Sequence, residues 1–355
     1  MITRTRYFVV ASLLVMGVGV GTGLVAYYVG FPAGAFTRGD GPDELRFLPR
    51  DAAVVAYVDV QDVMASQVRQ KLHRALPAGE NGQREFQERT GINIETDIDR
   101  IVACLNPGGA GNNLSGAGLV VARGRFDEVK IEALMREHGA HVEDYRGKRL
   151  VVADVGDHPT SFAVSFMEPG LIAVGNSNLV RTAVDLHQGG ENPQTGLASV
   201  TRNEELMTLV KSLDNGNVWA VGRFDVLASR ARLPQGIAER LPAITWFSAS
   251  GEVNGGLRAV IRAEARDEEA ATNLRDVVRG FIALGKLQAG SNPQMQLMAQ
   301  SLELGGTGKT VALSFVVPVE VFDAVETMLP KHRPEKPQIE KPDVQRPQVE
   351  KQPGA

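Results

Sequence analysis

Two histidines and two acidic residues near the middle of the chain have the side-chain types of a metal site. His138, His141, Glu143 and Asp144 are close in sequence, and imidazole with carboxylate is a common ligand set for zinc. Ligation requires these side chains on one surface, whereas Gly139 between the histidines predicts the end of a helix. His138 on a last helical turn would complement the helix dipole. We therefore assign no metal site and keep these four residues as candidates.

Two glycine-rich segments resemble loops that hold phosphate groups. Residues 305–310 read GGTGKT, but Glu303 occupies the position of the first glycine of a phosphate-binding loop, and a strand pattern follows. Residues 109–114 read GAGNNL, with Leu114 in place of the third glycine of a dinucleotide-binding fingerprint. We interpret both segments as hairpin loops and expect no cofactor.

Asp97 and Asp99 form an acidic pair of a kind that occurs in metal and sugar-nucleotide sites. They follow Thr96, and acidic residues are favoured in the first turn of a helix. We interpret the pair as a helix N-terminus.

The nucleophile candidates stand outside recognised catalytic motifs. No Gly-x-Ser-x-Gly elbow occurs in the sequence, and none of the six histidines has a recognised nucleophile context. Cys104, the single cysteine, lies in the apolar run 101–105, which predicts a core residue on a strand. We assign no catalytic residue. Because a triad can assemble from residues far apart in sequence, an exported hydrolase remains an alternative.

The charge balance argues against nucleic acid as a partner. The chain has 38 basic and 42 acidic residues, which are interspersed and give a net charge of -4. A nucleic-acid-binding surface needs a concentrated positive patch, and none is visible.

Strand and helix patterns alternate through residues 48–329. Alternating side chains over residues 53–59 predict a strand, and Met64, Val68, Leu72 and Leu76 at four-residue spacing predict a helix after it. Turns at 145–148 and 305–308 lie between extended segments and predict two hairpins. A helix that begins at Asp267 is expected to pack on a sheet through one apolar stripe. The stripe comprises Ala270, Leu274, Val277, Val278, Phe281 and Leu284.

Short sequence matches recur in the same order at a similar offset. Residues 62–66 (DVMAS) match 225–229 (DVLAS), and Asp127, Glu128 and Leu134 match Asp267, Glu268 and Leu274. A third match joins residues 183–184 to 324–325. We infer a duplication that gives two related α+β halves of antiparallel sheet with packed helices, 48–213 and 214–329.

The order of several short motifs resembles a family of bacterial membrane-anchored, exported proteins that is defined only as a domain of unknown function. The resemblance covers roughly residues 48–224 and rests on motifs that mark turns and element ends and carry no chemistry. The motifs are LPRDA at 48–52, TGI at 90–92, DI at 97–98, YRG at 145–147, LIAVG at 171–175 and NLV at 178–180. The family implies an exported α+β body on a membrane anchor and supplies no activity. The insert 107–118 is not part of the pattern.

The N-terminal segment predicts one membrane-spanning helix. Residues 7–29 carry no charge and would span roughly 33 Å as a helix, close to the hydrocarbon thickness of a bilayer. Arg4 and Arg6 precede the segment, so residues 1–6 are expected in the cytoplasm and the body outside it. Residues 30–47 are predicted to be a linker. The alternative is a signal peptide cleaved after Ala35.

Four glycines in the predicted helix have the spacing of a helix-dimerisation motif. Gly17 pairs with Gly21, and Gly19 pairs with Gly23, so two anchor helices could approach closely and form a homodimer.

Residues 330–355 form a predicted disordered tail that is rich in proline and charge. Taken together, these features predict a single-pass protein of the inner or plasma membrane. Its body would be a non-enzymatic, extracytoplasmic binding or scaffold module for an unknown envelope protein or ligand. A hydrolase would instead show a histidine bonded to serine or cysteine, and a lipid or small-ligand carrier would show an apolar cleft.

Overall fold

The structure is a computed structural model that describes residues 41–75, 84, 87–106, 118–154, 161–192, 194, 196–214, 216–230, 243–289 and 293–321. The predicted anchor 7–29, its four glycines and the tail 330–355 lie outside this range. In the described part of the chain, no helix is long and apolar enough to cross a membrane.

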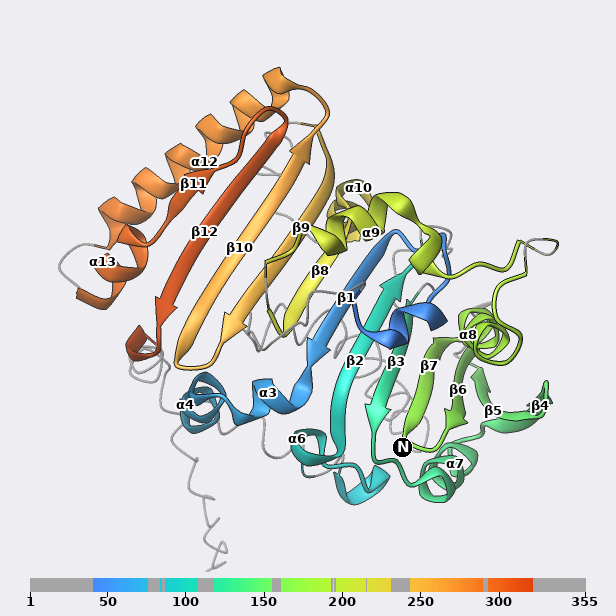
Figure 1. The fold of residues 1–355 in the computed structure, drawn as a ribbon. Helices are drawn as coiled ribbons and strands as arrows, with labels where there is room; N and C mark the ends of the chain where they lie inside the picture. Colours follow the sequence, from blue (N-terminus) through green and yellow to red (C-terminus); the bar gives the residue numbers. More distant parts are fainter. Residues whose placement is uncertain are drawn as a thin grey trace, which may run out of the picture.

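The described strands form one antiparallel sheet of 12 strands in the order β11-β12-β10-β9-β8-β1-β2-β3-β7-β6-β5-β4 (Figure 1). The strands of the first half are β1 (Val54–Asp59), β2 (Ile98–Leu105), β3 (Gly118–Gly124), β4 (His141–Tyr145), β5 (Lys148–Asp154), β6 (Ser161–Glu168) and β7 (Leu171–Asn176). Those of the second half are β8 (Val218–Arg223), β9 (Ile244–Val253), β10 (Gly256–Ala265), β11 (Glu303–Gly305) and β12 (Thr310–Pro318). The predicted antiparallel α+β class is confirmed.

Helices cover both faces of this sheet. They are η2 (Asp43–Phe47), α3 (Val60–Ala65), α4 (Gln67–Ala75), α6 (Ile94–Asp97), α7 (Glu128–Glu137), α8 (Ser177–Gly189), η4 (Val200–Arg202), α9 (Glu204–Lys211), α10 (Phe224–Arg230), α12 (Glu268–Gln288) and α13 (Pro293–Gln300). We call the face that carries Tyr57 and Trp219 the front face; η2, α8, η4 and α9 pack on it. On the opposite, back face, α3 and α7 pack over the first half and α12 over the second.

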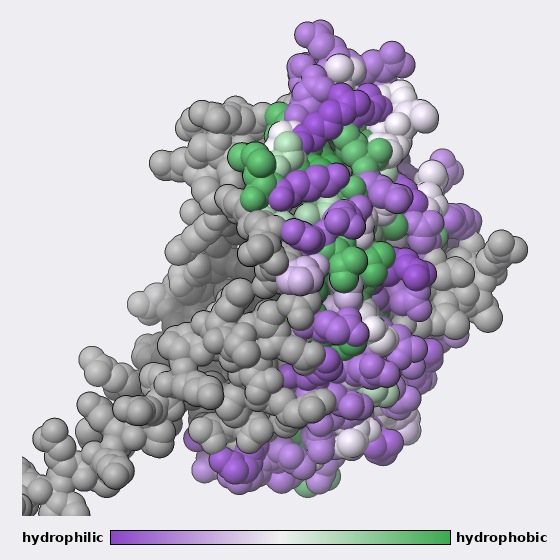
Figure 2. Space-filling view, turned by 90° about the vertical axis from the view of Figure 1, so that its left-hand side faces the viewer, coloured by the Kyte–Doolittle hydropathy of each residue, from purple (hydrophilic) through white to green (hydrophobic). Residues whose placement is uncertain are grey.

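Only the first half of α12 is covered. Ala270, Ala271 and Leu274 there are at most 7% exposed against β10 and β12. In the second half of the helix, Phe281 and Leu284 are 53% and 54% exposed. The prediction that these two side chains pack on the sheet is therefore wrong. Figure 1 places α12 and α13 at one end of the sheet, and Figure 2 looks onto that end, where hydrophobic residues gather among hydrophilic ones.

Burial on both faces explains the apolar central strands. In β1, Val55 and Tyr57 point to the front core, while Val54 contributes to a core on the back, and all three are at most 6% exposed. Cys104 on β2 is 3% exposed in the front core, as its apolar neighbours predicted. A strand covered on both sides reads as a continuous apolar run.

The predicted hairpins are confirmed, and both have glycine where the backbone requires it. Between β4 and β5, Arg146 and Gly147 have φ angles of 52° and 71°, the conformation of a tight hairpin turn. The turn between β11 and β12 includes Gly306 and Gly308, with φ angles of 91° and 56°. Because β12 follows this turn, residues 305–310 lack the helix N-terminus that a phosphate-binding loop needs.

The prediction of one helix after β1 is wrong, because Ser66 divides it. The Ser66 side chain donates to the Val63 carbonyl at 2.7 Å and accepts from the Arg69 amide at 3.1 Å. Ser66 therefore terminates α3 and caps α4. The four-residue apolar spacing of the sequence is thus shared between two separate helices.

The pairing of β1 with β8 joins the two halves of the sheet. The two strands run antiparallel from Val54 opposite Gly222 to Val58 opposite Val218, with Ala56 opposite Ala220 at the centre. At Gly222 the backbones approach so closely that a Cβ atom would lie 2.5 Å from the Ala53 carbonyl oxygen. Glycine is required there because the neighbouring group is backbone.

We expect Gly222→Ala to lower the free energy of unfolding by about 1–3 kcal/mol, because its methyl group forces β8 away from β1. Urea denaturation of the full chain measures this change. Gly255→Ala is the matched control, since a Cβ there meets nothing within 4 Å. Equal stability of the two variants would contradict the close approach.

Candidate functional site: two cavities beside a buried ion network

The front face contains a buried carboxylate held by two arginines. Glu44 on η2 is 1% exposed, and its Oε1 accepts hydrogen bonds from Arg100 Nε at 3.1 Å and Arg123 Nε at 2.6 Å. The two arginines are directly opposite each other on β2 and β3. The hydrogen bond to Glu44 raises the pKa of Arg123. A buried carboxylate is stable only when paired, so these bonds fix η2 to the sheet.

The network continues from Arg123 to a histidine on α8. Arg123 Nη2 donates to Glu168 Oε1 at 3.2 Å, and Glu168 Oε2 lies 3.4 Å from His187 Nε2. Burial opposes ionisation of Glu168, but the hydrogen bonds from His187 and Arg123 outweigh it and lower its pKa. The His187 ring packs against Phe47 with centroids 5.3 Å apart.

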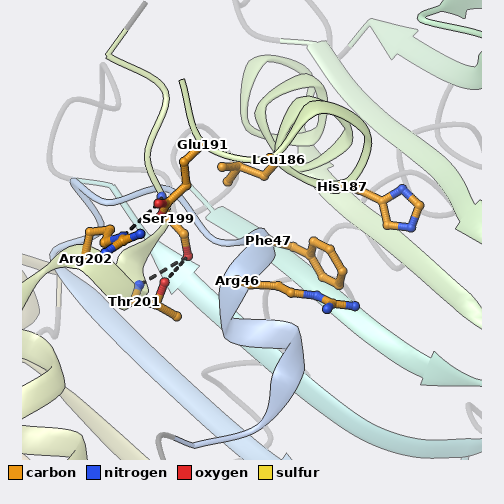
Figure 3. Close-up of a pocket in the computed structure, with 9 residues that line it drawn as sticks. Arg46, Phe47, Leu186, His187, Glu191, Ser199, Thr201 and Arg202 are labelled. Carbon is orange, nitrogen blue, oxygen red and sulfur yellow. Dashed lines mark hydrogen bonds and ion pairs between the residues drawn. The ribbon is translucent and has the colours of Figure 1, made fainter. Parts of the chain in front are cut away.

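A cavity of about 620 Å³ opens beside this histidine (Figure 3). Its lining comes from η2, the end of α8 and η4, and comprises Arg46, Phe47, Leu186, His187, Gly190, Glu191, Ser199, Thr201 and Arg202. The Arg46 guanidinium lies over the Phe47 ring, 4.7 Å from its centroid, and Arg202 pairs with Glu191 at 2.7 Å. We call this space the His187 cavity.

A second cavity, of about 990 Å³, is lined by residues from the segment before β1, from α8 and from the start of α9. They are Pro49, Arg50, Asp51, Asn106, Arg146, Leu179, Thr182, Asp185, Gly196, Leu197, Ala198, Asn203, Glu204 and Glu205. Asp185 is held by the Tyr145 hydroxyl at 3.0 Å and by Arg146 at 2.6 Å. We call this space the Asp185 cavity.

A short two-stranded ribbon borders both cavities. The Arg50 amide donates to the Ala198 carbonyl at 2.9 Å, and the Val200 amide donates to the Leu48 carbonyl at 2.8 Å. Side chains from this ribbon therefore contribute to the two linings, and each cavity has a volume that suits a small ligand.

Charged side chains of both signs line the cavities without an ion pair. Among the described residues, Arg46, Arg50, Glu204 and Glu205 form no ion pair and no side-chain hydrogen bond, although Arg46 lies over the Phe47 ring and Glu205 interacts electrostatically with Arg223. The arginines lie on or just after η2, and the glutamates begin α9. An unpaired charge in a ligand-sized cavity can bind an opposite charge without first breaking a bond.

Three histidines in the described part of the chain contact backbone or carboxylate oxygen. His138 Nδ1 lies 2.7 Å from the Leu134 carbonyl, His141 Nε2 lies 3.1 Å from Glu143 Oε1, and His187 contacts Glu168. Burial raises the pKa of the Cys104 thiol, so its reactive thiolate form is disfavoured.

The four metal candidates have separate structural roles. His138 is the C-cap of α7, which Gly139 terminates at a φ of 94°, as predicted. Glu143 bonds to Arg181 at 2.6 Å and to His141, and these bonds lower its pKa. Asp144 accepts from the Gly147 amide in the hairpin turn. Within the described part of the chain, no group of three or more His, Cys, Asp or Glu residues could hold a metal ion.

The prediction that Asp97 and Asp99 begin a helix is wrong. Asn93 caps α6, Asp97 ends it, and Asp99 already belongs to β2. Asp97 Oδ2 instead accepts from the Asn93 amide at 2.8 Å, and Oδ1 pairs with Arg125 at 3.1 Å. Asp97, the last residue of α6, therefore satisfies the backbone amide of Asn93 at the start of the same helix.

No protein-family model matches the chain, and no curated protein matches it. Among solved structures, the chain is similar to TP0453 in its crystal form III, with 9% sequence identity and a TM-score of 0.45. The match covers 82% of this chain and 100% of that chain. The family resemblance over residues 48–224 stays a prediction.

Sequence reasoning missed the residues that build this region. Glu44, Leu45 and Phe47 fall in the predicted linker 30–47, yet each is at most 2% exposed and packs on the front face. The available signal was the pair of buried-type side chains Leu45 and Phe47 before the first strand. Nothing local indicated that Glu44 would meet two arginines.

We expect Glu44→Gln to lower the free energy of unfolding by about 3 kcal/mol, because it leaves two arginines beside a neutral group. Denaturant titration at neutral pH tests this. Glu252→Gln removes an exposed partner of Arg258 and should cost less than about 1 kcal/mol. A loss at Glu44 no larger than at Glu252 would show that the buried network does not hold η2.

The acid limb of stability should depend on Asp97. The Asn93 amide and then Arg125 and Thr96 lower the pKa of Asp97, so this carboxylate stabilises the fold above its ordinary pKa of 3.8. That contribution is lost as the pH falls through the lowered folded-state pKa. Asp97→Asn should therefore be less stable than wild type at pH 7, and the difference should vanish in strong acid. Denaturation at a series of pH values measures it; a constant difference would contradict the assignment.

Proposed function

We propose that this chain is a membrane-anchored, extracytoplasmic binding or scaffold protein of the cell envelope with no enzymatic role. The observation that supports a binding role is the set of charges without an ion pair, Arg46, Arg50, Glu204 and Glu205, that line the His187 and Asp185 cavities. The membrane location is supported by the predicted anchor 7–29 alone. A nucleophilic catalytic site would need a nucleophile next to a base. In the His187 cavity, Ser199 Oγ donates to the Leu45 carbonyl and Thr201 Oγ1 donates to Ser199 Oγ, while His187 Nε2 lies next to Glu168, so neither hydroxyl is bonded to the imidazole.

The ligand class follows from the charges. Two cations and two anions border adjoining spaces, which suits a ligand that carries both an acidic and a basic group, such as a charged peptide segment. The linings are largely polar, so they support this class better than the apolar cleft of a lipid carrier.

We also propose that the body is a duplication of one α+β unit. The sheet reads β1-β2-β3-β7-β6 outward on one side of its centre and β8-β9-β10-β12-β11 on the other. A two-fold axis through the Ala56 and Ala220 pair would exchange these series. Asp127 and Asp267 support the relation, because each caps the helix after the third strand by accepting from the amide three residues on. The hairpin β4–β5 is then an addition to the first half.

The proposed location of the protein depends on the predicted anchor 7–29. We expect protease added to intact spheroplasts to digest the body and to leave residues 1–6 protected. Digestion of the body only after lysis would contradict an extracytoplasmic location.

We expect short peptides that carry one amine and one carboxylate to bind the full-length protein in detergent, measured by isothermal titration calorimetry. Arg46→Ala combined with Arg50→Ala should weaken binding at least about fivefold, as expected for a lost charge-assisted bond. Arg279→Ala removes an exposed arginine on α12, away from the cavities, and is the control. If the double variant and Arg279→Ala bind the peptides equally well, the cavities are not the binding site.

A further inference from the structure

The His187 cavity already holds a carboxylate, which belongs to the chain itself. Glu191 Oε2 accepts a hydrogen bond from Arg202 Nε at 2.7 Å, and Glu191 Oε1 accepts one from the Ser199 amide at 3.4 Å. All three residues line the cavity, and Figure 3 shows them together on one side of it, with Arg46 and His187 on the other. A guanidinium and a backbone amide that converge on one carboxylate have the geometry of a carboxylate-binding subsite.

The two donors are held in place by bonds outside this subsite. The Ser199 hydroxyl donates to the Leu45 carbonyl at 3.2 Å, and Ser199 is only 2% exposed. The next residue, Val200, donates its amide to the Leu48 carbonyl at 2.8 Å. These bonds attach η4 to the core beneath it, so the Ser199 amide and the backbone of Arg202 keep their positions when the carboxylate leaves. The subsite is therefore preorganised.

The carboxylate comes from a segment that is separate from these donors. Gly190 ends α8 with a φ angle of 64°, so the chain turns away from the helix immediately before Glu191. Asn192 and Leu197 then exchange backbone hydrogen bonds of 2.7 and 3.0 Å, which fix this segment without the Glu191 side chain. Because a glutamate side chain has several rotatable bonds, its carboxylate can leave the donors while the backbone stays in place.

The contact is weak enough for a ligand to displace it. The side chains of Glu191 and Arg202 are 29% and 69% exposed, and an ion pair open to solvent contributes little to stability. The 3.4 Å bond to the Ser199 amide is long for a hydrogen bond. Glu44 differs, because it is 1% exposed and its bonds attach η2 to the sheet. A ligand carboxylate that makes further contacts in the cavity can therefore replace that of Glu191.

We propose that Glu191 is an internal competitor in the His187 cavity, and that the carboxylate of a bound peptide displaces it to reach Arg202 and the Ser199 amide. This inference rests on the proposed peptide-binding function and assigns the acidic group of the ligand to one subsite. The basic group then faces Glu204 and Glu205 in the Asp185 cavity, on the other side of the two-stranded ribbon.

Titration calorimetry of the full-length protein in detergent with trialanine, which has one amine and one carboxylate, tests this displacement. Glu191→Ala should bind trialanine about two- to fivefold more tightly than wild type, the factor that corresponds to an exposed ion pair. Adding Arg202→Ala should remove this gain, because the donor is then absent. Glu252→Ala breaks an exposed ion pair with Arg258 outside the cavities, so this matched control should bind like wild type.

Trialanine amide, which lacks the carboxylate, provides the second arm. Glu191→Ala should give no gain for this probe, and equal gains for the two probes would overturn the carboxylate subsite. Equal affinities of wild type and Glu191→Ala for trialanine would also overturn it, while the proposed function would stand. If neither protein binds trialanine, both the inference and the proposed ligand class are wrong.

Circular dichroism checks that the variants are folded. If Glu191→Ala is not folded, Glu191→Gln replaces it, since this change removes the charge and keeps the shape of the side chain. It should shift the affinity for trialanine in the same direction, and an unchanged or weaker affinity would overturn the proposal.

Discussion

The antiparallel pairing of β1 with β8 is the constraint on which the rest of the structure depends. In the described sheet, it is the one strand pairing between the first half and the second. The remaining strands of each half follow in order on either side of this pair. Gly222 permits this ladder because its backbone lies within contact distance of Ala53 and Val54. With the pairing in place, both halves share one front face and one back face, and each helix layer has a surface to cover.

The Glu44 network shows how a buried charge can position the lining of a cavity. Its carboxylate is buried, so the free energy of leaving it unpaired ties η2 to Arg100 and Arg123. That attachment sets Arg46 and Phe47 beside His187, and the following residues form the ribbon with Ala198 and Val200. The cavities thus form on either side of the hydrogen-bonded segments 48–50 and 198–200.

Helix α12 combines a structural and a surface role along its length. Its first turns fill the back core with small residues, whereas its last turns present large apolar groups to solvent. The two ends of the sheet therefore differ: the ligand-sized cavities lie over the first half, and the exposed apolar side chains of α12 lie on the second.

The sequence by itself determined the local features of this protein: the alternation in β1, the turn at Arg146 and Gly147, and the Asp127 and Asp267 caps. Each depends on residues within about four positions, so the nearby side chains carry the information. Tertiary structure decided which half of the α12 stripe is buried. It also brought Glu44 to Arg100 and Arg123, which are 56 and 79 residues away. Such contacts depend on strand order and register, and the pattern of neighbouring residues does not encode which distant strand will be adjacent.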